Sequence, residues 1–400
     1  MIGADYKCEG QMSIFDLTQE NFKIRKPIRL IELFGGVGSQ AMALRDVGAD
    51  FVRYKLAEWE VSADASYNAI HNDSDFRNYG KGKSKEYLVR KLFKRGISSN
   101  GKMPMTYSEI KRKGYDWCLT TWNSFCQNQN LGSITKIKGS SLRIVDTDKY
   151  CYIVTYSFPC QDLSVAGLGK GMSKGSGTRS CLLWEVERLL NEVGNLPQVL
   201  LMENVPQVHG KSNMADFQKW IDFLSSKGYS NHWQDLNAKD YGVAQNRNRC
   251  FMVSILGDYR YEFPKPIPLT KKMKDYLEDE VDEKYYINNE KAQKLIDKLI
   301  SDGTIPQSRA EQSRAEQSRP ALTLRSTDQE RLKSQIASRQ DTMQESVISD
   351  RMVPVLSSIN EIGFIEKGTG KHQSNTIYGS DGVSPCVNAV NYKEPIKILE

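Results

Sequence analysis

The chain has 400 residues, of which 39% are hydrophobic and 10% aromatic, and it carries a formal net charge of +6. This length exceeds what one hydrophobic core comfortably fills, so two domains are expected. The sequence contains no run of 18 apolar residues and no basic segment followed by an apolar one at its N-terminus. We therefore expect a cytoplasmic protein with no membrane partner. The mild positive charge permits a polyanionic partner without requiring one.

The cysteines and histidines do not follow a metal-binding or disulfide pattern. Eight cysteines and four histidines are scattered along the chain, and neither a CxxC nor an HxxxH spacing occurs. The sequence therefore predicts no metal site and no disulfide scaffold, and most of the thiols are expected to be small buried hydrophobes.

The first predicted elements form a βαβ unit. Residues 28–34 (IRLIELF) have the apolar run of a buried strand, a glycine turn follows, and SQAMALRDVG has helical character. The next strand is predicted at residues 51–60. This order is typical of an α/β fold with a doubly wound, mostly parallel sheet of Rossmann-like type.

The glycine turn and the end of the second strand predict a nucleotide-like ligand. Gly36, Gly38 and Ala41 form a GxGxxA pattern that lets backbone amides approach such a ligand. Glu58 is placed to accept hydrogen bonds from ribose hydroxyls, and the adjacent Trp59 offers a flat face to an adenine. A plain tight turn with a surface glutamate and a core tryptophan would give the same pattern, and both NAD and S-adenosylmethionine enzymes use it.

Residues 72–138 are polar and Lys-rich, and they are predicted to be an insertion that is helical in part. The α/β alternation then resumes, with strands expected at 151–157, 198–204, 229–237 and 249–257, and helices at 181–193 and 215–228. A proline-rich junction follows near residue 258. The prediction is a first domain over residues 1–258 and a smaller second region over 259–400, whose QSRAEQSRAEQSR repeat (307–319) favours a solvated helix or linker.

A cysteine and a glutamate follow two successive strands of the predicted sheet. Cys160 comes directly after Pro159, at the end of the strand at 151–157, in a loop whose glycines allow movement. Glu203 lies at the end of the next strand. A thiolate that adds to an electron-poor ring and an acid that holds a ring nitrogen would suit this pair. A core cysteine and a solvated glutamate are the simpler alternative.

Basic residues precede the last predicted strand. Gln245, Arg247 and Arg249 alternate in YGVAQNRNRCF, so on an extended backbone they would point to one face. Two guanidinium groups on one face suit a phosphate backbone or carboxylates, and a surface salt-bridge strand is equally compatible.

Six motifs follow one another over residues 28–255: FGGVG, AEWE, SFPCQDLSVAG, GTRSCLLWE, MENV and QNRNR. In this order they resemble the motifs of DNA (cytosine-5)-methyltransferases of bacterial or phage type. The resemblance implies S-adenosylmethionine as cofactor and double-stranded DNA as partner, with residues 259–400 reading bases. It implies that Cys160 adds to carbon 6 of a flipped-out cytosine, that Glu203 engages ring nitrogen 3, and that Arg247 and Arg249 belong to the catalytic site. The cofactor site implied by it comprises Phe34, Gly36, Gly38, Glu58, Trp59, Pro159 and Leu182.

Two stretches depart from the family pattern. KGSSLRI offers Ser140 and Ser141 where the family has an acidic residue near the adenine, so reduced cofactor affinity is expected. The family pattern closes with an Arg-rich helical motif and a terminal helix that carries a cofactor motif. Residues 376–400 resemble the stretch just before these two motifs, and residues 319–332 are only a weak candidate for the Arg-rich one. We therefore expect a second chain to supply the missing motifs. The first alternative is a methyltransferase-like subunit that binds DNA without catalysing methyl transfer. The second is an NAD-dependent oxidoreductase, which would share the glycine turn and Glu58 but does not require the FPCQ and ENV motifs.

Overall fold

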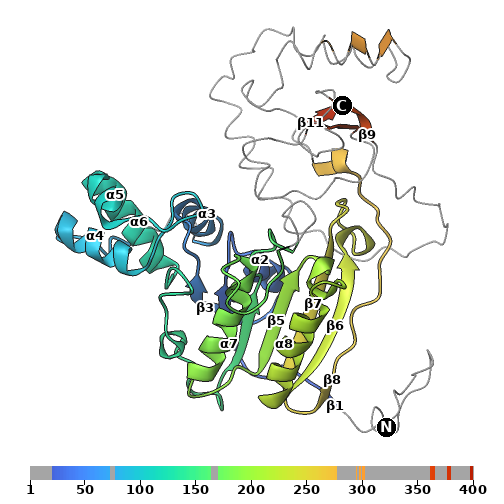
Figure 1. Cartoon of the computed structure of the whole chain (residues 1–400), viewed down its shortest axis with the longest axis horizontal. Helices are drawn as coiled ribbons and strands as arrows, with labels where there is room; N and C mark the ends of the chain where they lie inside the picture. The colour runs from blue at the N-terminus through green and yellow to red at the C-terminus, as the bar shows by residue number, and fades with distance from the viewer. Residues whose placement is uncertain are drawn as a thin grey trace, which may run out of the picture. The chain divides into compact units, whose positions relative to one another are not determined.

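The computed structural model describes residues 20–72, 77–163 and 170–276, five residues between 294 and 301, and three short strands nearer the C-terminus. The chain divides into two compact units, one formed by Met1–Leu236 with Asn248–Lys265 and the other by Asn237–Arg247 with Pro266–Glu400 (Figure 1). No helix in the described part of the chain is long and apolar enough to cross a membrane.

The first unit is built on a six-stranded sheet with the order β3-β2-β4-β5-β7-β6. Its strands are β2 (Ile28–Leu33), β3 (Phe51–Ala57), β4 (Cys151–Tyr156), β5 (Val199–Asn204), β6 (Tyr229–Asn237) and β7 (Asn248–Leu256). Strands β3, β2, β4 and β5 are parallel, and β7 is antiparallel to β5. The mostly parallel, doubly wound sheet predicted from the sequence is confirmed. Its strand order reverses between β2 and β4, which is where such sheets bind ligands.

Helices cover both faces of this sheet, which explains why its central strands are apolar on both sides. All six residues of β4 are buried. Figure 1 shows α7 and α8 on one face and α2 on the other. The helices of this layer structure are α2 (Ser39–Asp46), α3 (Val61–His71), α7 (Leu183–Glu192) and α8 (Met214–Ser226). Short 3-10 helices accompany them: η1 (Gly139–Leu142), η3 (Ser180–Leu182) and η4 (Pro206–His209). A small parallel pair, β1 (Glu20–Asn21) with β8 (Tyr259–Arg260), completes the unit.

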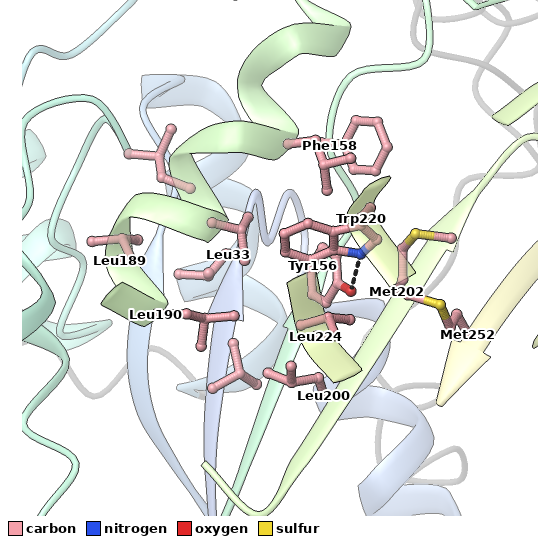
Figure 2. Packing of buried hydrophobic residues seen from close by; sticks show 14 of the residues in the cluster. Leu33, Tyr156, Phe158, Leu189, Leu190, Leu200, Met202, Trp220, Leu224 and Met252 are labelled. Carbon is pink, nitrogen blue, oxygen red and sulfur yellow. Dashed lines mark hydrogen bonds between the residues drawn. The ribbon is translucent and has the colours of Figure 1, made fainter. Parts of the chain in front are cut away.

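The main core lies between the sheet and the α7–α8 face (Figure 2). Trp220 of α8 is fully buried there, and its indole Nε1 donates a hydrogen bond of 3.1 Å to the Tyr156 hydroxyl of β4. The polar atoms of both rings thus have a partner inside the core, as buried Tyr and Trp side chains require. Helix α7 contributes Leu183, Val186 and Leu189, whose spacing places them on one helical face.

The predicted insertion contains three helices with a small core of their own. These are α4 (Lys85–Lys94), α5 (Tyr107–Arg112) and α6 (Tyr115–Gln127), which gather beside β3 in Figure 1. Their starts follow from local chemistry, because Ser84 accepts a hydrogen bond from the amide of Tyr87, and Thr106 with Glu109 forms a capping box.

The second unit includes η5 (Ala238–Asp240), η6 (Met273–Tyr276) and a three-stranded sheet. In that sheet β10 (Thr376–Gly379) pairs antiparallel with β9 (Glu361–Phe364) and parallel with β11 (Lys397–Leu399). The repeat at 307–319 and the stretch at 319–332 lie outside the described residues, as does 376–400 apart from β10 and β11.

Candidate active site

Several of the predicted site residues lie at or just beyond the carboxyl ends of four neighbouring parallel strands. Leu33 of β2 is in register with Ala57 of β3 and with Tyr156 of β4, and Tyr156 is in register with Met202 of β5. The next residue of each strand, or the first beyond it, therefore emerges at one edge of the sheet. These residues are Phe34, Glu58, Ser157 and Glu203.

The glycine turn after β2 is tightly fixed. Phe34 adopts a left-handed backbone (φ 58°), and its amide donates to the Ala57 carbonyl at 2.9 Å. A non-glycine residue in this region is strained by on the order of 1 kcal/mol, and such strain concentrates at functional sites. Gly38 has φ 83°, and a Cβ there would lie 2.3 Å from Nε2 of His71. Both the backbone angle and the lack of space therefore require glycine at position 38.

A buried carboxylate that the sequence analysis missed supports this turn. Glu32 of β2 is 1% exposed and accepts hydrogen bonds from the Tyr67 hydroxyl at 2.6 Å and the Ala41 amide at 3.3 Å. Burial raises the pKa of Glu32, and the hydrogen bond from Tyr67 partly offsets this. Glu32 thus ties α2 and α3 to β2. The signal in the sequence was a charged residue inside an otherwise apolar strand.

The structure brings Glu58 against the glycine turn. Its Oε2 accepts a hydrogen bond of 3.0 Å from the Gly36 amide, and its Oε1 accepts one of 2.7 Å from the Glu60 amide. Burial raises the pKa of Glu58 to about 7, although these backbone amides oppose the shift. A carboxylate acceptor held beside a glycine turn fits the hydroxyl donors of a ribose, so the residues present suit an adenosine-containing cofactor.

Asn130, which follows α6 in the insertion, holds the backbone of Glu58. It is fully buried, and its Oδ1 accepts from the amide of Glu58 at 3.1 Å while its Nδ2 donates to the carbonyl of Glu58 at 2.9 Å. The same side chain accepts from the Gly132 amide and donates to Asp64 Oδ1 at 2.8 Å. Burial raises the pKa of Asp64. Nothing local in the sequence marks Asn130, because its partners lie far away in the chain.

The loop that carries Cys160 is tied to the 3-10 helix η3, which leads into α7. The Pro159 carbonyl accepts from the Ser180 hydroxyl at 2.7 Å, and the Asp162 carboxylate accepts from the Arg179 amide at 2.7 Å. The Cys160 carbonyl accepts from the Leu163 amide at 3.0 Å, and the Cys160 side chain is partly exposed. Residues 164–169, with two of the glycines predicted to let the loop move, lie outside the described residues.

Glu203 and the cysteine loop are joined through the next residue of β5. Asn204 is 2% exposed, and its Nδ2 donates to the Phe158 carbonyl at 3.0 Å. Glu203 itself forms an ion pair with Arg249 of β7, with 3.0 Å between Oε1 and Nε. The Glu203 side chain is only 19% exposed and the Arg249 side chain only 15%. The thiol loop and a shielded carboxylate–guanidinium pair thus occupy adjacent strand ends.

Of the three alternating residues, only Arg249 lies in a strand, because β7 begins at Asn248, so an extended backbone does not place all three on one face. Arg247 lies in a loop that closes on Asn237 and Ala238: its amide donates to Asn237 Oδ1 and its carbonyl accepts from the Ala238 amide, each at 3.0 Å. Arg247 belongs to the second compact unit and Arg249 to the first.

The other two predicted cofactor contacts lie near these elements. Trp59 follows Glu58, and its carbonyl accepts from the Ser98 amide at 2.7 Å. Leu182 ends η3 and packs, partly buried, on the main core. Their roles remain predictions.

A glycine turn, a carboxylate acceptor, a thiol loop and a partly buried ion pair at the carboxyl ends of neighbouring strands suit group transfer to a ring. Comparison with known proteins decides the family: the profile of C-5 cytosine-specific DNA methylases matches residues 93–375. The chain belongs to this family. The match includes Cys160, Glu203 and Arg249 and begins after the glycine turn.

Two curated relatives, at 40% and 35% identity, agree with this assignment. The orphan methyltransferase M.SssI of Spiroplasma monobiae is 40% identical over 267 residues, covering 66% of this chain and 68% of the relative. The type II methyltransferase M2.ScrFI of Lactococcus lactis is 35% identical, covering 66% and 71%. Among solved structures, the Dnmt2 methyltransferase of S. pombe is similar with a TM-score of 0.42 and 17% identity, covering 67% of this chain and 65% of that one. The chain is therefore a DNA cytosine methyltransferase, of a family that uses S-adenosylmethionine.

Proposed function

We propose that this methyltransferase modifies carbon 5 of cytosine in double-stranded DNA through a covalent bond between Cys160 and the base. The observation that carries the proposal is the hydrogen bond from Asn204 to the Phe158 carbonyl. It fixes the start of the thiol loop beside the strand end that presents Glu203. Nucleophile and acid then act on one ring from neighbouring strands of a rigid sheet.

Cys160 acts as the nucleophile in this mechanism. Its thiolate forms a carbon–sulfur bond at carbon 6 of cytosine, and the electron pair of the 5,6 double bond becomes available at carbon 5. After carbon 5 has been alkylated, loss of its proton restores the double bond and breaks the carbon–sulfur bond. The thiolate is thereby released unchanged.

Glu203 holds ring nitrogen 3 during these steps. A proton shared between its carboxyl group and nitrogen 3 stabilises the negative charge that the addition pushes into the ring. Arg249 fixes the orientation of that carboxyl group through the 3.0 Å contact with Oε1. Arg249 is therefore a positioning residue, and Arg247 is proposed to contact the DNA backbone from its own loop.

The cofactor is proposed to lie across the carboxyl ends of β2 and β4. Glu58 would accept hydrogen bonds from its ribose hydroxyls, while Phe34, Trp59 and Leu182 would contact the adenine. Gly36, Gly38 and Pro159 would let the backbone approach it closely. When bound, S-adenosylmethionine supplies the methyl group that carbon 5 receives.

The target base must leave the helix, because stacking hides carbon 6 from a thiolate. We propose that residues 259–400 contribute to recognition of the DNA sequence. Relatives named type II and orphan methyltransferases, one of them from a phage, support a role in restriction–modification or in protection of mobile DNA.

A trapping experiment tests the covalent step. Duplex DNA that contains 5-fluorocytosine is incubated with the chain and S-adenosylmethionine, because the fluorine at carbon 5 cannot leave as a proton does. We expect a stable protein–DNA adduct, mapped to Cys160 by mass spectrometry and absent in Cys160→Ser. Methyl transfer to ordinary DNA without any adduct on fluorinated DNA would overturn the mechanism.

A further inference from the structure

A second group of reactive side chains lies in the first unit, on three elements that are far apart in sequence. His209 of η4, Asp235 of β6 and Cys250 of β7 bring their ligand atoms to within 4.8 Å of one another. We call this group the His–Asp–Cys cluster. Among the residues that the structure describes, this is the one place where three or more His, Cys, Asp or Glu side chains lie close enough together to hold a metal ion. The methyl-transfer mechanism makes no use of it.

The donor set suits a divalent transition metal. Imidazole nitrogen, carboxylate oxygen and thiolate sulfur are each ligands that zinc uses in proteins, and tetrahedral coordination needs ligand atoms about 3.4–3.6 Å apart. His209 Nε2 and Asp235 Oδ1 are already 2.9 Å apart, so small side-chain shifts would open the cluster around an ion. A thiolate and a carboxylate together balance the charge of a dication, with the imidazole neutral.

The surrounding structure holds the three side chains in place. Cys250 is fully buried and in register with Asn204 on the neighbouring strand, and its Sγ lies within 4.8 Å of the ligand atoms of His209 and Asp235. The His209 ring packs 4.6 Å from the Trp233 ring and 6.1 Å from that of Phe217. This packing fixes the ring plane before any ion arrives.

The cluster is also open to solvent on one side. The side chains of His209 and Asp235 are 20% and 32% exposed, whereas Cys250 forms the closed end. An ion could therefore enter from the Asp235 side and keep water as its fourth ligand. The nearby guanidinium of Arg249 is engaged with Glu203, so its charge is already compensated.

We propose that His209, Asp235 and Cys250 bind one divalent transition metal ion of the zinc class. The bound ion would link the segment after β5, just beyond Glu203, to strands β6 and β7, and so stiffen one side of the methyltransferase site. The proposal differs from the expectation drawn from sequence, where no metal-ligand spacing occurs. It is independent of the proposed methyl-transfer mechanism.

Cobalt provides the probe, because it occupies zinc sites and reports thiolate ligation by colour. The full chain is stripped with a chelator and titrated with Co²⁺ while the near-ultraviolet absorbance is recorded. We expect saturation at one equivalent, with a sulfur-to-cobalt charge-transfer band that Zn²⁺ abolishes by displacement. Cys250→Val should remove the band. His209→Gln, at a partly exposed position that tolerates change, should weaken Co²⁺ binding at least tenfold.

Cys126→Ser serves as the matched control, because Cys126 is a partly buried thiol of α6 outside the cluster. It should retain both stoichiometry and band, with circular dichroism confirming the fold of each variant. The absence of saturable Co²⁺ binding would mean that the cluster is only a hydrogen-bonded His209–Asp235 pair beside a buried thiol, and would overturn the proposal. A band that persists in Cys250→Val, or normal affinity in His209→Gln, would overturn it equally.

Discussion

Replacement of Asn130 by alanine tests whether the helical insertion supports the cofactor site. The Asn130 side chain makes four hydrogen bonds: to the amide and carbonyl of Glu58, to the Gly132 amide and to the Asp64 carboxylate. It is fully buried, so water would replace these bonds poorly. At a net value of roughly 0.5–1.5 kcal/mol for each bond, the loss of all four would destabilise the protein by about 2–6 kcal/mol.

The same substitution should weaken cofactor binding. Two of the four bonds fix the backbone of Glu58, whose carboxylate is proposed to hold the ribose. A hydrogen bond to a charged group contributes roughly 1.5–3 kcal/mol, and a loss of about 1.4 kcal/mol corresponds to a tenfold change in affinity. We therefore expect the dissociation constant for S-adenosylhomocysteine to rise about tenfold or more.

Asn123→Ala is the matched control for this experiment. Asn123 is likewise a buried asparagine of the insertion, in α6, but its hydrogen bonds go to the Gly80 amide at 3.0 Å and to Asn78 at 3.4 Å. Urea denaturation measures the stability of both variants, and isothermal titration calorimetry measures the cofactor affinity of the folded protein. Asn123→Ala should lose stability but not affinity. If Asn130→Ala bound the cofactor as tightly as the wild type, Asn130 would be a stabilising residue without a positioning role.

Three further predictions concern the site itself. Cys160→Ser should abolish methyl transfer while calorimetry shows unchanged cofactor binding, because a serine hydroxyl ionises far less than a thiol near neutral pH. Glu203→Gln should reduce single-turnover methyl transfer at least a hundredfold, since the amide cannot share an acidic proton with nitrogen 3. A wild-type rate in that variant would make the glutamate structural. The pKa of Glu58 is raised to about 7, so between about pH 4.5 and pH 7 the folded state binds more protons than the unfolded one. Its contribution to stability should therefore fall as the pH rises through this range, and cofactor affinity should rise, because ribose hydroxyls favour the charged carboxylate. Glu58→Gln should flatten the pH dependence of both the unfolding free energy and the cofactor affinity. If urea denaturation between pH 5 and 8 gave the variant the same pH dependence of unfolding free energy as the wild type, the raised pKa would not belong to Glu58.

Much of the fold was predictable because its signals are local. The strands of the sheet are continuous apolar runs, and a strand of this kind buried on both faces, as β4 is, indicates helices above and below it. Glycine turns and strand ends are equally local features. They predict Glu58 near Gly36 and Glu203 near the Cys160 loop. In the structure Glu58 accepts a hydrogen bond from the Gly36 amide, and Asn204, next to Glu203, donates one to the Phe158 carbonyl.

The supports of the site were not predictable, because each joins residues that are distant in sequence. Asn130 reaches Glu58 only because the insertion folds back beside β3. Glu32 meets Tyr67 only because α3 packs against β2. The segment before β7 gives a related case. The alternation of Gln245, Arg247 and Arg249 would place them on one face only on an extended backbone, whereas Arg247 lies before β7 in a loop bonded to Asn237.

A common design connects these supports. Each functional group at the sheet edge is held by a buried or shielded side chain from another element: Glu58 by Asn130, Glu203 by Arg249, and the loop of Cys160 by Asn204. Buried hydrogen bonds are directional, and removing one partner leaves the other unsatisfied, so they fix position more sharply than apolar contacts do. A reaction that requires a thiolate and an acid at two atoms of one ring depends on such positioning. Variants of the supporting residues should therefore impair catalysis through geometry while every reacting group is still present.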